Sequence, residues 1–146
     1  MFKCQKIYKI EYAHQLYSSF TNLCHETIHG HSGKIEIEFV SEVSTEKLNS
    51  DGMVIDFGQI SAIVKSHIME KYDHALFMPK MFPDGYLNGL KLFNKRLTIT
   101  DENPTAENFA KWIFFEVDKL LEKNEIPVYV NRVTFWETET GCASYQ

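Results

Sequence analysis

The segment Cys24-His25-Glu26-Thr27-Ile28-His29-Gly30-His31 contains three of the six histidines and one of the three cysteines of this 146-residue chain. The residues that follow, Gly33-Lys34-Ile35-Glu36-Ile37-Glu38-Phe39-Val40, alternate between apolar and charged and predict a strand over residues 31–43. Side chains two apart on a strand share a face, so His29 and His31 lie on the buried face, about 7 Å apart. Two such imidazoles can bind one metal ion if a third ligand comes from elsewhere in the fold.

The strand before this segment supplies a third imidazole. Residues 2–14 alternate between apolar and polar, which predicts a strand with one buried face, and His14 ends that face. Antiparallel pairing with the next strand would bring His14, His29 and His31 to one end of the sheet. Three histidines with an open fourth position are a ligand set of catalytic zinc, whereas structural zinc sites use more cysteines. We therefore predict a catalytic zinc site.

Other residues are candidates for acid–base chemistry or ligand recognition. Cys24 and Glu26 lie just upstream of the paired histidines, and Asp73-His74 places a carboxylate beside an imidazole. Such a pair is also common where a helix ends, so it does not decide the function by itself. Glu137 closes a largely apolar strand face, where a carboxylate either reaches water or recognises a ligand. Together with the three histidines, these groups favour an enzyme over a packed core.

The composition indicates a single globular domain over residues 1–146, with 44% hydrophobic and 24% charged residues. A net charge of −5 without a basic cluster argues against nucleic acid as a partner. Three cysteines at no paired spacing indicate a reducing compartment. No run approaches the roughly 18 apolar residues of a membrane span. We therefore expect a cytoplasmic protein that binds neither nucleic acid nor membrane.

The remaining patterns predict an α+β fold. The expected elements, in order, are strands at 2–14 and 31–43, helices at 57–71 and after Thr105, and strands at 128–137 and 142–145. Asp56 and Thr105 are suited to cap the two helices. Residues 75–103 are expected to form a long irregular connection with a short strand at 97–99. This order favours a four-stranded antiparallel sheet with two helices on one face.

Six spaced motifs, taken together, resemble the 6-pyruvoyl-tetrahydropterin synthase family. They are Tyr12-Ala13-His14, Cys24 with His29-Gly30-His31, Val54-Ile55-Asp56-Phe57, Asp73-His74, Asn103-Pro104-Thr105-Ala106-Glu107 and Glu137-Thr138. The Ile-Asp-Phe motif is similar to that of the bacterial branch, the 6-carboxytetrahydropterin synthases of queuosine biosynthesis. The resemblance implies a T-fold whose sheets join between subunits into a barrel. It also implies a homo-oligomer, a trimer or hexamer, with active sites assembled between chains.

The resemblance also implies roles for individual residues. By motif position, His14, His29 and His31 would bind zinc, Cys24 would abstract a proton, Asp73 and His74 would be its acid–base partners, and Thr105, Glu107 and Glu137 would contact the pterin ring. The implied substrate is 7,8-dihydroneopterin triphosphate.

The spacing upstream of His29 leaves the product open. Four residues separate Cys24 from His29, which lies between the spacings expected of the bacterial carboxy branch and the animal branch. Glu26, three residues before His29, resembles the Glu-x-x-His-Gly-His pattern of a branch that releases 6-hydroxymethyl-dihydropterin for folate synthesis. Of the three possible products, the carboxy-type product is the leading expectation, followed by the folate-type and pyruvoyl-type products. The non-catalytic alternative is a pterin- or purine-binding module with structural zinc. An unrelated zinc hydrolase is the least favoured of the alternatives.

Overall fold

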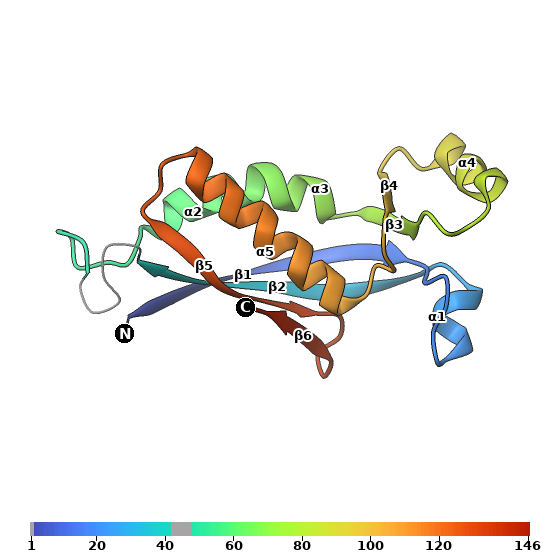
Figure 1. The fold of residues 1–146 in the computed structure, drawn as a ribbon, viewed down its shortest axis with the longest axis horizontal. Helices are drawn as coiled ribbons and strands as arrows, with labels where there is room; N and C mark the ends of the chain where they lie inside the picture. The colour runs from blue at the N-terminus through green and yellow to red at the C-terminus, as the bar shows by residue number, and fades with distance from the viewer. Residues whose placement is uncertain (1, 42–47) are drawn as a thin grey trace.

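The computed structural model describes residues 2–41 and 48–146, so the last two residues of the strand expected at 31–43 lie outside the described residues. The elements are β1 (Lys3–His14), α1 (Asn22–Glu26), β2 (His29–Ser41), α2 (Phe57–Val64), a π-helical turn η1 (Lys65–Met69), α3 (Glu70–Tyr72), β3 (Ala75–Pro79), α4 (Asp84–Phe93), β4 (Leu97–Thr100), α5 (Ala106–Lys123), β5 (Val128–Trp136) and β6 (Cys142–Tyr145). Figure 1 shows the long strands as one curled layer and the helices α2, α3 and α5 as a second layer on one face.

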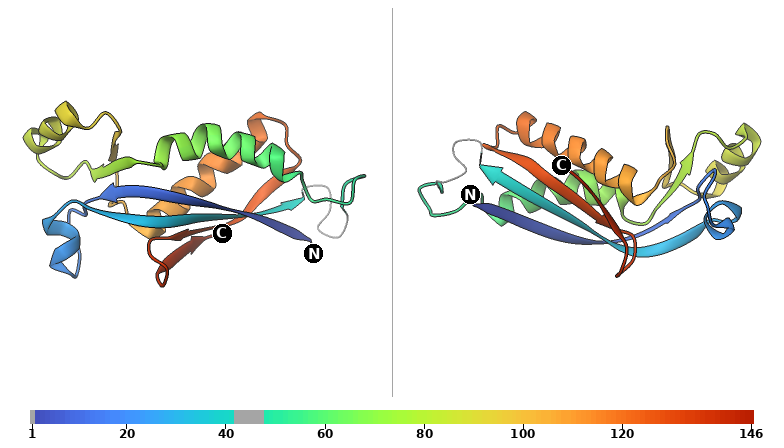
Figure 2. Two further views of the ribbon diagram at one scale, coloured as in Figure 1. Left: turned by 180° about the vertical axis from the view of Figure 1, so that it is seen from behind. Right: turned by 60° about the horizontal axis from the view of Figure 1, so that its bottom comes forward.

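The sheet has six strands in the order β4-β3-β1-β2-β5-β6. The pairs β1–β2, β2–β5 and β5–β6 are antiparallel, as expected, whereas β3 runs parallel to β1 and β4 runs parallel to β3. The expected α+β class and the helices on one face are confirmed. The expectation of a purely antiparallel, four-stranded sheet is wrong, because two parallel strands extend one edge. Figure 2 shows the curl of this sheet from two further directions.

The segment expected to be irregular, residues 75–103, supplies the missing strands and an extra helix. Every residue of β3 is buried, so the strand does not alternate between apolar and polar side chains. A short apolar run of this kind does not reveal its secondary structure through periodicity. The short strand expected at 97–99 is confirmed as β4, and α4 connects the two strands.

The two long helices begin where the sequence predicted. Asp56 accepts a hydrogen bond from the backbone N–H of Gly58 at 2.6 Å, and Thr105 accepts one from the N–H of Asn108 at 3.4 Å. The helix expected at 57–71 is continuous to Tyr72 and includes η1. The core lies between the sheet and these helices, and the buried residues of α5 are Phe109, Ala110, Ile113, Val117 and Leu121. Over residues 2–41 and 48–146, no helix combines the length and apolar character needed to cross a membrane.

Candidate metal centre and active site

Strand register brings three histidines together at one end of the sheet. His14 is opposite His29 in the β1–β2 pair, and His31 is one pleat further along β2. The nearest ring nitrogens of His14 and His29 are 3.1 Å apart, and one nitrogen from each of the three rings lies within 4.8 Å of the others. Ligands of a tetrahedral zinc ion at roughly 2.0–2.1 Å lie about 3.3 Å apart. The predicted cluster is therefore confirmed as a geometry that can hold a metal ion.

Backbone carbonyls fix the proton on the outer nitrogen of two of the rings. Nδ1 of His14 lies 2.7 Å from the carbonyl oxygen of Pro104, and Nδ1 of His29 lies 3.2 Å from that of Thr27. A carbonyl only accepts, so each Nδ1 carries the proton and donates it. In the neutral rings both Nε2 atoms then direct lone pairs at each other. A cation between them would relieve this repulsion. Metal-bound histidines commonly donate the N–H of their other ring nitrogen to a backbone carbonyl in this way.

Burial keeps the cluster in the form that binds metal. His14 is 1% exposed, and burial lowers its pKa to about 4, although the hydrogen bond to Pro104 raises it in part. Burial also lowers the pKa of His31, while the charge of Glu137 opposes that change. The Nε2 atom of His31 is buried and has no hydrogen-bond partner within the described residues. Neutral imidazoles with free lone pairs fit zinc, so the residues suit the predicted ion.

The lowered pKa of His14 predicts how pH affects the stability of the metal-free protein. Because the folded-state pKa is about 4 and the unfolded value is 6.5, the unfolded chain binds more protons between these pH values. The free energy of unfolding should therefore be highest above pH 6.5 and fall by about 3 kcal/mol as the pH drops to 4. Urea unfolding after chelation, at several pH values, measures this. A His14→Gln variant with an undiminished slope would contradict the assignment to His14.

Glu137 lies over the histidine cluster. It follows β5 directly, and its carboxylate is 3.6 Å from Nε2 of His14 and 3.8 Å from Nε2 of His31. Its backbone N–H donates to the carbonyl of Gly141 at 3.0 Å, which holds the residue in the turn before β6. Because the pKa of His14 is lowered, its ring is neutral and does not balance the negative charge of the Glu137 carboxylate. A cation in the cluster would balance that charge. One-third exposure of its side chain leaves the carboxylate accessible to a small molecule.

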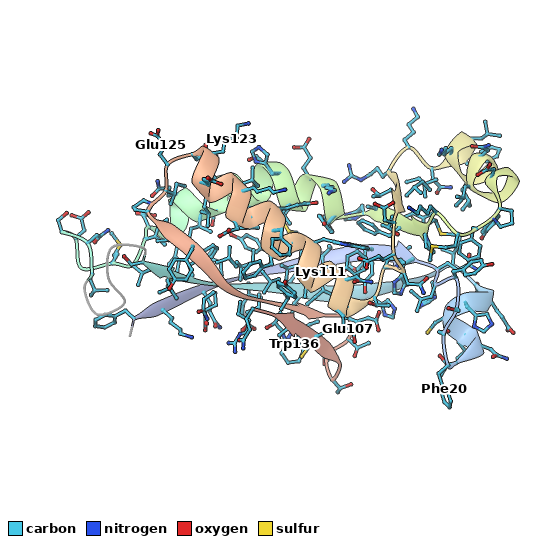
Figure 3. All side chains as sticks on the ribbon, viewed as in Figure 1. Phe20, Glu107, Lys111, Lys123, Glu125 and Trp136 are labelled. Carbon is cyan, nitrogen blue, oxygen red and sulfur yellow. The ribbon has the colours of Figure 1, made fainter. Side chains whose placement is uncertain are left out.

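The start of α5 borders the same cluster. Pro104 supplies the carbonyl that binds His14, and the side-chain oxygen of Asn103 accepts the backbone N–H of Tyr17 at 2.7 Å. Thr105 is the N-cap of the helix, and Glu107 is exposed in its first turn, where Figure 3 labels it. The structure thus places Thr105 next in sequence to a residue that contacts the metal cluster. It gives Glu107 no hydrogen bond or ion pair within the described residues.

Cys24 and Glu26 occupy a short helix just upstream of the paired histidines. Both lie on α1, where residues two apart are about 200° apart around the axis, so their side chains diverge. The Sγ atom of Cys24 accepts a hydrogen bond from the hydroxyl of Thr21 at 3.4 Å, and this cysteine is half-buried. Glu26 is exposed. The two candidate bases therefore have different surroundings.

Asp73 and His74 form an ion pair that is separate from the metal cluster within one chain. Nδ1 of His74 is 3.0 Å from the Asp73 carboxylate, whose other oxygen accepts the backbone N–H of Glu11 at 2.9 Å. Burial raises the pKa of Asp73, but the hydrogen bonds from Glu11 and His74 outweigh it and the pKa is lowered. His74 adopts a left-handed backbone with φ of 57° and is 72% exposed.

His74 borders a cavity of about 570 Å³ beside the strands β1 and β2. His74 lines this cavity together with Ala13, Gly30 and Ser32, which alternate along β1 and β2 with the metal-cluster histidines, and Tyr12 and His31 also border it. Alternating residues of a strand point to opposite faces. The side chains of Ala13 and Ser32 therefore face away from the histidine cluster, while the cavity itself is bordered by both His74 and His31.

Sequence reasoning did not identify Tyr12 or the two backbone carbonyls as parts of the site. Tyr12 is buried beside His14 and His31, with ring centroids 5.3 and 5.6 Å away, and its hydroxyl has no partner within the described residues. Burial and the charge of Glu137 raise the pKa of this hydroxyl. The alternation of β1 already placed Tyr12 on the face of His14, so that signal was present. The carbonyl contacts depend on tertiary structure and had no sequence signal.

Comparisons with known proteins agree with these features. Residues 3–146 match the model of the 6-pyruvoyl tetrahydropterin synthase family. The chain is 27% identical over 148 residues to 6-carboxy-5,6,7,8-tetrahydropterin synthase of Haemophilus influenzae, covering 100% of this chain and 99% of that protein. It is 32% identical over 120 residues to the enzyme of the same name from Rickettsia felis, covering 80% of each.

Solved structures share the fold. An uncharacterized protein from Wolinella succinogenes superposes with a TM-score of 0.78 and 19% identity, over 99% of this chain and 97% of that one. A Plasmodium vivax 6-pyruvoyltetrahydropterin synthase, in which a catalytic glutamate is replaced by alanine, superposes with a TM-score of 0.67 and 17% identity, over 99% and 98%. Together with the family match along nearly the whole chain, these findings identify the protein as a member of the 6-pyruvoyl tetrahydropterin synthase family.

Proposed function

We propose that this protein is a zinc-dependent 6-carboxy-5,6,7,8-tetrahydropterin synthase that converts 7,8-dihydroneopterin triphosphate in queuosine biosynthesis. The observation that carries the proposal is the set of three imidazoles with one ring nitrogen of each within 4.8 Å of the others, two of them held by backbone carbonyls. The names of the relatives from Haemophilus influenzae and Rickettsia felis support the carboxy-type product. When bound, zinc supplies Lewis-acid chemistry that polarises the hydroxyls of the substrate side chain and acidifies the neighbouring C–H.

In this proposal Cys24 removes a proton from carbon. A thiolate is the reactive form of cysteine, and a nearby cationic centre favours it. The half-buried position of Cys24 keeps the thiol accessible to a substrate while limiting its contact with water. The proposed roles of Asp73 and His74 involve a second subunit.

The exposed position of His74 supports a site that is completed by a second subunit. Within the described residues of one chain the Asp73–His74 pair makes no hydrogen bond to the histidine cluster and His74 is exposed, so in our proposal it serves the cluster of a neighbouring copy in a homo-oligomer, a trimer or hexamer. Asp73 would orient the ring of His74 and stabilise its protonated form, as the carboxylate of a catalytic triad does. Light scattering that gives an active monomer of 17.0 kDa would contradict this part of the proposal.

Glu137, Thr105 and Glu107 are proposed to bind the pterin ring. A carboxylate can accept two parallel hydrogen bonds from the amino group and ring N–H of a pterin, and such charge-assisted pairs are the stronger hydrogen bonds. Glu137 is accessible and rigidly held in its turn, which suits this role best. Thr105 caps α5 and Glu107 lies in its first turn, directly after Pro104, whose carbonyl contacts His14.

A Glu137→Gln substitution is expected to weaken substrate binding about tenfold, because it replaces one of two acceptor oxygens with a donor and removes the charge. The measurement is the Kd for substrate, with zinc content determined on the same samples. Glu139→Gln is the matched control, since Glu139 is exposed in the same turn. Equal substrate affinity in all three proteins would argue against Glu137 as the pterin anchor.

The direct test of the proposed function is to incubate the zinc-loaded protein with 7,8-dihydroneopterin triphosphate and identify the product by mass. Formation of 6-carboxy-5,6,7,8-tetrahydropterin is the expected result. Formation of 6-hydroxymethyl-dihydropterin would instead support the second candidate, a folate-type activity. That candidate is favoured by the position of Glu26 three residues before His29 and by the catalytic glutamate of the Plasmodium vivax structure. Binding of pterin without turnover would support a binding module and overturn both.

A further inference from the structure

The segment between β1 and β2, residues 15–28, carries Cys24 but has little that holds it in place by itself. Its helix α1 is five residues long, buries none of its residues and has no side-chain N-cap. Isolated helices of this length are unstable in water, because the conformational entropy lost in forming the first turn outweighs the free energy gained from its hydrogen bonds. Phe20, labelled in Figure 3, and Leu23 are exposed, so they do not anchor the segment to the core.

Two hydrogen bonds from the end of β1 hold the backbone at Cys24. The N–H of Leu16 donates to the carbonyl of Cys24 at 2.9 Å. The side-chain amide of Gln15 donates to the carbonyl of His25 at 2.7 Å. These contacts fix two consecutive peptide groups at the cysteine. The position of the thiol therefore depends on residues that follow the metal-binding His14 directly in sequence.

Gln15 is in turn oriented by α4, the helix that joins the two parallel strands. It is 6% exposed, and its side-chain oxygen accepts the hydroxyl of Tyr86 at 2.7 Å. Because the His25 carbonyl can only accept, the amide nitrogen must face it and the oxygen must face Tyr86. A buried polar group with both ends paired in this way is costly to rearrange.

Aromatic contacts add to the link between α4 and the cysteine segment. The ring of Tyr86 lies edge-on to Phe82 with centroids 5.4 Å apart, and Phe82 makes the same kind of contact with Tyr17 at 5.4 Å. Figure 1 places α1 and α4 at the same end of the molecule, beyond the ends of β1 and β3. The hydroxyl of Tyr86 is thus the only polar group of this aromatic set that bonds to Gln15 among the described residues.

We propose that Tyr86 and Gln15 are positioning residues of the active site, which hold Cys24 in its reactive orientation through the chain Tyr86–Gln15–His25 carbonyl. The helix α4 then has a function beyond connecting two strands, because it fixes the position of the candidate base. A positioned base matters because an error of about 1 Å in geometry can cost up to about 100-fold in rate. The inference rests on the proposed role of Cys24, so its test includes a measurement that needs no turnover.

The test compares Tyr86→Phe with the wild-type protein. This change removes the hydroxyl and keeps the ring contact with Phe82. Tyr17→Phe is the matched control, because Tyr17 packs edge-on against the same ring and its hydroxyl has no hydrogen bond among the described residues. One readout is the rate at which iodoacetamide alkylates Cys24, followed by peptide mass spectrometry, with Cys4 as an internal reference on β1. The other is kcat and KM for the proposed substrate, with zinc content.

In Tyr86→Phe we expect alkylation of Cys24 to rise about fivefold, since one hydrogen bond is lost, while Cys4 is unchanged. We expect kcat to fall about tenfold with KM changed less than about twofold and zinc content unaltered. In a Gln15→Met background, Tyr86→Phe should have no further effect, because Tyr86 acts through Gln15. Tyr17→Phe should match wild type in every readout.

An unchanged rate of Cys24 alkylation in Tyr86→Phe would overturn the inference, as would an equal rise at Cys4, which would indicate general loosening. A full additional effect of Tyr86→Phe in the Gln15→Met background would also overturn it. These outcomes differ from failure of the proposed function. If Cys24→Ala keeps full turnover, Cys24 is not the base, and the alkylation rates still decide whether Tyr86 and Gln15 position it.

Discussion

Replacing His29 with alanine is expected to remove nearly all zinc from the purified protein. His29 supplies one of three convergent nitrogens, and its Nε2 is 3.1 Å from that of His14. Loss of an outer-shell partner alone typically costs about 10- to 100-fold in metal affinity, so loss of a ligand should cost more than about 100-fold. Metal analysis after purification and a competitive chelator titration measure the effect. Turnover should fall with zinc occupancy.

His25→Ala is the matched control for this experiment. His25 lies four residues away on α1, and its ring contacts the Ser19 hydroxyl at 3.3 Å and not the metal cluster. It should retain zinc at the wild-type level. Full zinc retention in His29→Ala would refute the three-histidine site. Thermal unfolding of the metal-free forms shows whether either substitution disturbs the fold itself.

The part of the site that depends on strand alternation could be predicted from the sequence. The two-residue period of β1 and β2 fixes which side chains face the helices, and a register error of one residue would move them all to the other face. His14, Ile35 and Phe39 are buried on that face as expected. The pairing of His14 with His29 follows from the antiparallel register. Local pattern and tertiary structure agree here, so the prediction succeeded.

The rest of the site is fixed by contacts that leave no local pattern. The strand β3 is covered on both faces and carries no alternation, so its parallel pairing with β1 was missed. That pairing brings His74 beside β1, where its backbone N–H donates to the carbonyl of Glu11, and the sequence carries no signal of this contact. The link from Tyr86 to Gln15 spans 71 residues and depends on α4, a helix with one buried residue, Leu87. Pro83 and Asp84-Gly85 at the start of this helix are turn signals, so the sequence favoured a loop there.

The choice between Cys24 and Glu26 as base is the prediction that decides the reaction. The two residues share the helix α1, yet their side chains point about 200° apart, so both cannot face the same substrate atom from one side of the helix. Cys24 is half-buried and Glu26 is exposed. Water stabilises the charge of an exposed carboxylate and makes it a weak base toward carbon. A thiolate near a cationic centre is better suited to remove a proton from carbon.

Cys24→Ala is therefore expected to lower kcat by about 100- to 10,000-fold, the range typical of a lost acid–base group. Glu26→Ala should lower it by less than about threefold, because an exposed side chain on the surface of α1 contributes little to a preorganised site. Both are measured at saturating substrate with zinc content matched, and Cys142→Ala, which changes an exposed cysteine on β6, controls for thiol loss elsewhere. If Glu26→Ala loses turnover and Cys24→Ala keeps it, the carboxylate is the base. The folate-type product would then replace the carboxy-type product as the proposed outcome of this site.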